Sequence, residues 1–173
     1  YAGSSFPIGS SFASPAILAS YPNETATIRG PGGSDMVNLA HAYIHHVVFD
    51  RLIFDANNYK TALSIGSGAH HIRFQNGEIK ESHGICGDPN NAGPNVLLDG
   101  VGHEFLNSLI HNSFCSYGFY VANTDGTIID GCTIYNNYGY AIQLYDGSSS
   151  ASNNAIIRNN RMSGNGYGAL TTG

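Results

Sequence analysis

One spacing recurs along the last two thirds of this 173-residue chain and limits what the chain can fold into. Two apolar residues stand five positions apart, and the pair returns after 25, 31, 24 and 28 residues; the pairs are Phe49/Phe54, Phe74/Ile79, Phe105/Ile110, Ile129/Ile134 and Ile157/Met162. Self-similarity at a period of about 20 to 50 residues is typical of solenoids, in which each repeat packs only against its neighbours. The variable period indicates insertions that project as loops.

Aligning the chain on these pairs adds further columns. A third apolar position is Leu63, Ile85, Phe119, Ile142 or Leu170, and a small residue precedes each: Ala62, Gly84, Gly118, Ala141 or Ala169. Small residues are expected where a chain enters a strand through a crowded corner. Three residues after each pair stand Asn57, Ser82, Ser113, Asn137 and Asn165, which predict a polar ladder at one turn. With right-handed crossovers, the columns predict an all-β fold, a right-handed single-stranded parallel β-helix of about five to six coils of three short strands.

The domain organisation follows from where the pairs begin. Residues 1–40 are expected to form an irregular first coil and loops, with short strands at Ala16–Ala19 and Ala26–Arg29. Residues 41–173 are expected to form the coils, truncated at the C-terminal end, so that the chain is one continuous solenoid domain. The chain has no initial Met and ends in a strand-like segment without a polar cap, which predicts a fragment.

Composition excludes several classes of protein. Charged residues make up 11% of the chain and Gly contributes 22 residues, which disfavours a helical bundle. Seven basic residues and a net charge of −5 leave no footprint for nucleic acid. The sequence has no apolar run long enough to span a membrane. The odd number of cysteines argues against a disulfide framework, although one pair with a free thiol remains possible.

A polar row follows the second apolar position directly. Its members are Asp55, Lys80, His111, Tyr135 and Ser163. Lys80, His111 and Tyr135 are the candidate catalytic residues, because Lys, His and Tyr side chains can exchange the protons of a β-elimination beside a sugar carboxylate. Glu81 lies in the adjoining row. The alternative is that Lys80, Glu81 and Asp55 form ordinary surface ion pairs, which are worth little.

Candidate substrate-binding residues come from a second row, which precedes the small column. His83, Tyr117 and Tyr140 could form an aromatic strip for stacking sugars, and Arg73 and Glu81 complete the set. The alternative is that outward tyrosines are ordinary strand residues.

Two histidine pairs, His45-His46 and His70-His71, fall in equivalent columns. Neutral imidazoles one coil apart could share a transition metal, but no carboxylate or cysteine completes the set, and a turn ladder is the favoured alternative. No residue is therefore assigned as a metal ligand. If the imidazoles stack, their protonation should loosen the coil pairing at acidic pH.

Three segments, 10–30, 69–79 and 134–137, resemble right-handed parallel β-helix proteins of the polysaccharide-lyase (pectate-lyase-like) superfamily. The first segment is similar to the pattern Pro-Ile-x-Leu-x-Ala-Tyr-Pro-Gly-Glu of their early coil, with Asn23 in place of the Gly. The resemblance implies a secreted lyase or epimerase acting on uronic-acid polysaccharide, with Ca²⁺ as a possible cofactor. No stretch matches a catalytic motif residue by residue, so no catalytic residue is carried over.

Other readings remain open. Asn123–Gly126 is similar to a polygalacturonase signature, but Tyr138-Gly139 stands where that family has a pair of aspartates, and a plain turn explains the motif. The segments 88–94 and 146–154 are expected to follow the third strand of their coils and to wall a groove. The alternative to an enzyme is a non-catalytic adhesin, glycan-binding protein or extracellular scaffold, for which end-to-end assembly is conceivable.

Overall fold

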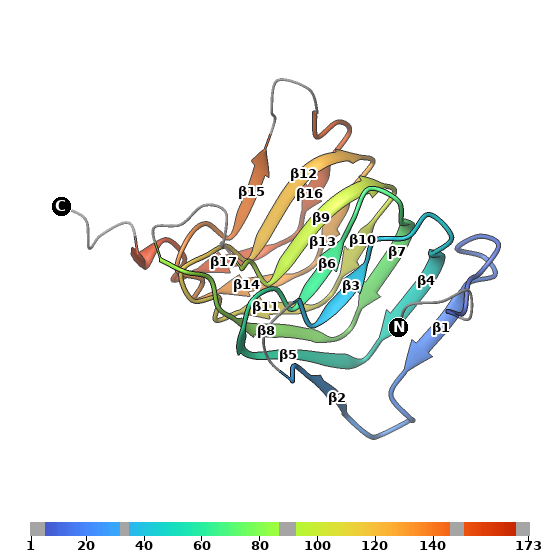
Figure 1. Ribbon diagram of the computed structural model, residues 1–173, viewed down its shortest axis with the longest axis horizontal. Helices are drawn as coiled ribbons and strands as arrows, with labels where there is room; N and C mark the ends of the chain where they lie inside the picture. The colour runs from blue at the N-terminus through green and yellow to red at the C-terminus, as the bar shows by residue number, and fades with distance from the viewer. Residues whose placement is uncertain (1–5, 32–34, 87–92, 146–150, 169–173) are drawn as a thin grey trace.

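The computed structural model describes residues 6–31, 35–86, 93–145 and 151–168, and within them the chain forms a parallel β-solenoid of about five turns (Figure 1). Three strands per coil define three faces. The first face holds β1 (Ala16–Ala19), β4 (His45–Asp50), β7 (His70–Gln75), β10 (Glu104–Leu106), β13 (Ile128–Asp130) and β16 (Ile156–Arg158). The second holds β2 (Ala26–Arg29), β5 (Leu52–Tyr59), β8 (Glu78–Ser82), β11 (Leu109–His111), β14 (Thr133–Tyr135) and β17 (Arg161–Ser163). The third holds β3 (Val37–Leu39), β6 (Leu63–Ile65), β9 (Val96–Val101), β12 (Phe119–Asp125) and β15 (Ile142–Tyr145).

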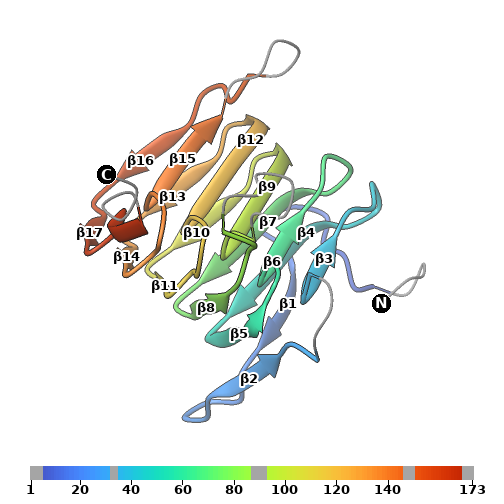
Figure 2. The same ribbon diagram turned by 60° about the vertical axis from the view of Figure 1, so that its left-hand side comes forward.

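The pairing is between equivalent strands of successive coils. The second face is a continuous sheet in the order β17-β14-β11-β8-β5-β2, and its pairs are parallel. Figure 2 shows the coils stacked in chain order, with β1 and β2 at one end of the stack and β16 and β17 at the other. The predicted all-β solenoid and the two short strands expected before residue 40 are confirmed.

The five-residue spacing of the apolar pairs arises from a sharp corner between the first and second strands. The residue two positions after each first pair member has a left-handed backbone: φ is 55° at Arg51, 55° at Asn76, 49° at Asn107, 68° at Gly131 and 56° at Asn159. A left-handed residue turns the chain within one or two positions, and Asn and Gly adopt this conformation at the least cost. Both members are therefore buried in the same core in the first four pairs, whereas Ile157 and Met162, in the last described coil, are exposed.

The core is a stack of these side chains. Phe54, Phe74 and Phe105 are fully buried, with ring centroids 5.1 Å and 6.4 Å apart along the stack. Phe119 of the third face closes the interior edge-on against Phe105 at 5.0 Å. Burying each such ring contributes about 1.5–3 kcal/mol, so stacking the coils supplies the main driving force for folding.

The third apolar column was assigned wrongly in one coil. Val96, and not Ile85, pairs with Leu63 and Phe119, and Ile85 is 60% exposed outside any strand. The small column therefore contains Asn95 in place of Gly84. Elsewhere the crowding is as predicted, since a Cβ on Gly118 would lie 2.5 Å from the carbonyl oxygen of Ala141. Ala169 and Leu170, the predicted members of these two columns in the last coil, lie outside the described residues.

The insertion assignment fails for the same reason. Segment 88–94 lies between β8 and β9, so it precedes a third strand, whereas segment 146–154 follows the third strand β15. The prediction that both segments follow a third strand is therefore wrong for segment 88–94. The described residues cover only parts of both segments.

The predicted polar ladder exists, and Asn95 joins it. Asn95 Nδ2 donates to Asn137 Oδ1 at 3.0 Å, and Asn137 Nδ2 donates to Asn165 Oδ1 at 2.8 Å. Asn95 and Asn137 are fully buried. The left-handed residues of this corner precede the ladder by one position in four coils, where φ is 58° at Glu81, 56° at Asn112, 51° at Asn136 and 61° at Gly164. The ladder residues there are held by hydrogen bonds and not by their own left-handed backbone.

The three cysteines form one disulfide and leave one free thiol. Cys86 and Cys115 form a disulfide that joins the ends of two successive corners, and Cys132 is free and buried. Burial raises the pKa of the Cys132 thiol to about 11, so this thiol is unreactive at neutral pH.

Candidate functional site

The register of the second face brings the candidate catalytic residues together. Lys80 pairs with Asp55 on one side and His111 on the other, and His111 pairs with Tyr135. The side chains of equivalent outward positions are neighbours because adjacent parallel strands lie about 4.8 Å apart. The predicted row is therefore a continuous strip across β5, β8, β11 and β14.

Glu78, which the sequence reasoning missed, organises this strip. Its Oε1 lies 2.8 Å from Lys80 Nζ and 2.9 Å from His111 Nε2. Burial opposes ionisation of Glu78, but the hydrogen bonds from Lys80 and His111 outweigh it and lower the pKa of this carboxyl. The period of two along β8 could have identified Glu78, because it lies on the same side of the strand as Lys80.

The three candidates differ in what they can reach. The hydrogen bond to Glu78 raises the pKa of Lys80, so the amine is held as a cation. His111 is 7% exposed and its ring stacks on Tyr135 with centroids 4.5 Å apart. Tyr135 is half-buried, and its hydroxyl has no hydrogen-bond partner among the described residues. Tyr135 is thus the group best placed to exchange a proton with a ligand, and His111 lies beneath it.

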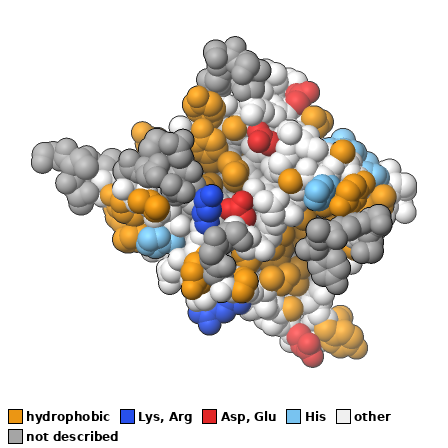
Figure 3. All heavy atoms as spheres, in the orientation of Figure 1, with side chains coloured by type: hydrophobic (Ala, Val, Ile, Leu, Met, Phe, Trp, Pro, Cys, Tyr) orange, Lys and Arg blue, Asp and Glu red, His pale blue; other side chains and the backbone are white. Residues whose placement is uncertain are grey.

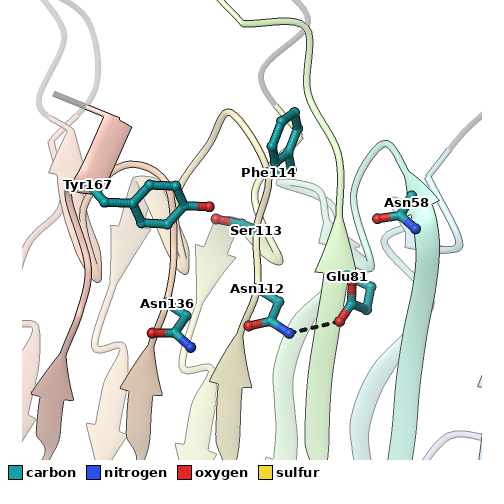
Figure 4. Close-up of a pocket in the computed structure, with 7 residues that line it drawn as sticks. All are labelled: Asn58, Glu81, Asn112, Ser113, Phe114, Asn136 and Tyr167. Carbon is teal, nitrogen blue, oxygen red and sulfur yellow. Dashed lines mark hydrogen bonds between the residues drawn. The ribbon is translucent and has the colours of Figure 1, made fainter. Parts of the chain in front are cut away.

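A groove of about 360 Å³ runs beside this strip, along the corner that follows the second face (Figure 4). Amide and carboxylate side chains lie along it, and two aromatic rings stand at its side; the lining residues are Asn58, Glu81, Asn112, Ser113, Phe114, Asn136 and Tyr167. Asn112 Nδ2 donates to Glu81 at 2.8 Å. Three groove residues directly follow the candidate catalytic residues in sequence: Glu81 follows Lys80, Asn112 follows His111 and Asn136 follows Tyr135. The strip and the groove therefore form one surface.

Glu81 is unusual in its backbone. Its φ of 58° places it in the left-handed region, where the equivalent residues are Asn112, Asn136 and Gly164. This conformation costs a residue other than Gly, Asn or Asp about 1–2 kcal/mol. Strained residues cluster at functional sites, and this carboxylate lines the groove.

The predicted aromatic strip divides into two ladders. His83 stacks on Phe114 at 4.7 Å, and that ladder continues through Tyr138 and Tyr167, which the sequence reasoning missed. His83 was misplaced in the row of Tyr117 because the alignment slipped at Ile85.

Tyr117 and Tyr140 form the second ladder, at the edge of the third face. Their rings are nearly parallel, with centroids 5.8 Å apart, so much of each facing ring surface is used in stacking on the other. Tyr120 and Tyr145 extend this cluster, with their centroids 5.7 Å apart. Neither Tyr117 nor Tyr140 lines the groove.

Arg73 lies on the first face, away from the groove. Its guanidinium binds Glu104, with Nε and NH2 each 2.7 Å from Oε2, and covers the ring of Phe12 at 4.3 Å. The structure therefore does not bring Arg73 together with Lys80, His111 and Tyr135. The Asn123–Gly126 motif forms the end of β12 and its turn, with φ of 52° at Asn123 and a hydrogen bond from Asn154 to Asp125.

The part of the chain that the structure describes contains neither a metal-binding cluster nor a membrane-spanning helix. Within residues 6–31, 35–86, 93–145 and 151–168, no group of three or more His, Cys, Asp or Glu side chains is placed to hold a metal ion. The carboxylates of this part of the chain do not fit a Ca²⁺ ion, which takes six to eight oxygen ligands. The same ranges contain no helix that is long and apolar enough to cross a membrane.

Comparison with known proteins gives one match. Residues 38–173 match the family model described as the right-handed β-helix region. No curated protein and no solved structure matches the chain. The family match agrees with the parallel three-faced solenoid and supplies its right-handed sense, but it does not extend to the pectate-lyase-like superfamily. The chain belongs to the right-handed β-helix family.

Proposed function

We propose that the second face and its groove bind a uronic-acid polysaccharide and act on it as a lyase or an epimerase. The observation that carries the proposal is the convergence of Lys80 and His111 on Glu78, with Tyr135 stacked above, beside a groove of amides and aromatic rings. Successive coils repeat at a distance close to the length of one sugar unit. Equivalent side chains can therefore contact successive units of one polymer.

The proposed chemistry begins with one proton. The Lys80 ammonium pairs with the uronate carboxylate and makes the hydrogen on the neighbouring carbon more acidic. Tyr135 is the exchanging group, and the ring of His111, which is bound to Glu78, stacks on it and fixes its position. Tyr135, as its phenolate, takes the proton, and the electron pair of the broken C–H bond stays on the sugar. In a lyase this pair forms the double bond as the bond to the β-oxygen breaks, and the leaving oxygen takes the proton back from Tyr135. In an epimerase a water molecule on the opposite side protonates the carbon, and Tyr135 gives its proton to the resulting hydroxide.

Secretion is part of the proposal. The Cys86–Cys115 disulfide supports it, because disulfides persist in oxidising compartments and are rare in the cytosol. The polysaccharide partner is supported by the low charge density and amide-rich lining of the groove.

The test is direct assay of the chain with alginate, pectate and glycosaminoglycans. A lyase gives the ultraviolet absorbance of an unsaturated product, and an epimerase gives deuterium uptake from heavy water at the carbon beside the carboxylate. We expect Tyr135→Phe to lower the rate by roughly 100-fold, and Lys80→Met to weaken binding of the acidic polymer. Tyr145→Phe, on the third face, is the matched control and should leave both unchanged.

Two outcomes refute the enzyme. Binding without product or isotope uptake on any of the polymers would identify the alternative, a non-catalytic glycan-binding or scaffold protein. Absence of binding, measured by titration calorimetry, would refute the polysaccharide partner as well.

A further inference from the structure

Four imidazoles are stacked at the corner that leads into β4 and β7; we call them the imidazole stack. The ring of His45 lies over that of His70 with centroids 4.9 Å apart, and His46 lies over His71 at 4.7 Å. Within each coil the two Nδ1 atoms are close, at 3.1 Å for His45 and His46 and 2.9 Å for His70 and His71. The stacked rings therefore join the two coils, and the Nδ1 contacts join the two rings within each coil.

An N-terminal loop, residues 9–14, docks on this stack. The loop closes through a hydrogen bond from Ser10 N to Ser14 O at 3.0 Å. Phe12 at its tip lies edge-on to His46 and His71, with centroids 5.7 Å and 5.9 Å away. Gly9 N donates to the carbonyl oxygen of His45 at 3.3 Å. Figure 3 shows His side chains gathered on this side of the molecule.

The segment just before the loop covers an apolar end of the solenoid. Phe6 and Pro7 line a cavity of about 480 Å³ whose other walls include Leu18, Phe49 and Phe54. Phe6 and Pro7 thus cover this end of the core, and the docked loop that follows them holds them in place. Releasing the loop would expose apolar side chains to water.

The stack tolerates little positive charge. An Nδ1–Nδ1 hydrogen bond needs one N–H and one bare nitrogen, so each pair must contain a neutral ring. The charged groups nearby are Arg73, which covers Phe12, and its partner Glu104, and His103 is buried behind β7. None of the ion pairs found among the described residues joins a carboxylate to these four rings.

Burial and the neighbouring imidazoles act in one direction. Burial lowers the pKa of His46, and His71, His45 and His70 lower it further. Burial likewise lowers the pKa of His70, followed by His45 and His71. A histidine whose pKa is lower in the folded state stabilises that state above its ordinary pKa. The stabilisation is lost as the pH falls below about 6.5 towards the lowered value.

We propose that the imidazole stack is an acid-sensitive latch. Protonation of both rings of a pair breaks their Nδ1 contact, repels the rings from one another and from Arg73, and releases the loop 9–14 with the cover formed by Phe6 and Pro7. The arrangement fits a protein whose N-terminal end opens when it enters an acidic medium. It is independent of the proposed polysaccharide site, which lies on another face.

Hydrogen exchange of the whole chain tests the latch. Between about pH 7.5 and about pH 5, after correction for intrinsic exchange, the protection of the Gly9 and Ser14 amides should fall by roughly tenfold or more. The amides of Leu98 and Val121, in the core of β9 and β12, exchange only through global unfolding, so they should stay more protected than the loop at both pH values. Fluorescence of anilinonaphthalene sulfonate should rise with the same midpoint as the cavity opens.

The matched variants separate the latch from general acid instability. His46→Asn with His71→Asn cannot be protonated, and Asn accepts the positive φ of 52° and 54° at these positions. This double variant should lose the pH dependence of loop protection, whereas His41→Asn, outside the stack, should keep it.

The proposal is overturned if wild-type loop protection is unchanged at acidic pH, or if the double variant keeps the full dependence. Should the double variant not fold, the histidine ring signals of the wild type decide by nuclear magnetic resonance. Their titration must coincide with the loss of Gly9 and Ser14 protection, and separate midpoints refute the latch.

Discussion

Replacing Asn137 by Ala tests how much the polar ladder stabilises the stack. The Asn137 side chain is fully buried and makes four hydrogen bonds. Its Oδ1 accepts from Asn95 Nδ2 at 3.0 Å and Ser113 N at 3.1 Å; its Nδ2 donates to Ile110 O at 3.4 Å and Asn165 Oδ1 at 2.8 Å. Each bond contributes about 1 kcal/mol net, so Asn137→Ala should lower the free energy of unfolding by about 4 kcal/mol.

That value is closer to a minimum than to a maximum. Asn95 Nδ2 keeps its bond to the carbonyl oxygen of His111, but Ser113 N is left buried without an acceptor. An unsatisfied buried donor costs about 1–3 kcal/mol, and water entering the cavity would recover part of it. Asn165, at the half-exposed end of the ladder, should tolerate the same substitution better.

The assay is urea unfolding of the variant beside wild type, with the same slope required of both. Ser163→Ala is the matched control, because Ser163 is exposed on β17 and should change stability by less than about 0.5 kcal/mol. A loss below about 1 kcal/mol for Asn137→Ala would refute the reasoning. It would mean that the ladder fixes the register of the coils without stabilising them.

Two further predictions concern acid and reducing conditions. His103 is fully buried, and burial lowers its pKa from 6.5 to about 4. The stability that depends on its neutral form is complete above pH 6.5. It declines as the pH falls towards 4, by about 3 kcal/mol in all. Urea unfolding from neutral to acidic pH should show this decline, and His103→Gln should flatten it; an equal decline in the variant would contradict the assignment. The Cys86–Cys115 disulfide closes a separation of 29 residues, so Cys86→Ser with Cys115→Ser should lower the free energy of unfolding by about 3–4 kcal/mol. Thermal melting with and without a reductant checks this, and identical curves for wild type would argue against the bond.

The row of candidate catalytic residues shows how much of the site could be predicted from the sequence. Lys80, His111 and Tyr135 were placed side by side from sequence alone, because equivalent positions of successive coils must be neighbours in a parallel stack. Their orientation could not be predicted. Lys80 and His111 are both bound by Glu78, and only the side-chain packing shows that Tyr135 remains the accessible member.

The error at Ile85 shows why the columns alone were insufficient. The segment between β8 and β9 is long, and Ile85 follows a Gly just as the true third-strand residues follow small residues. Choosing Val96 requires knowing that Asn95 can be buried in a small-residue column. That is possible only because its amide is satisfied by Ser82 N, His111 O and Asn137 Oδ1, the last two of which come from later coils.

The sequence by itself determined the repeat, the parallel stack and the rows on its surface, because a strict apolar spacing with Asn or Gly at the corners leaves few other ways to bury the pairs. The tertiary structure decided which row members meet. It brings Lys80 and His111 together on Glu78 beside the groove and keeps Arg73 and His83 apart from that cluster. It also places Phe12 on the imidazole stack. Apart from the Glu78–Lys80 pair, these contacts join residues from different coils, and no local pattern encodes the direction in which a side chain turns once its row is fixed.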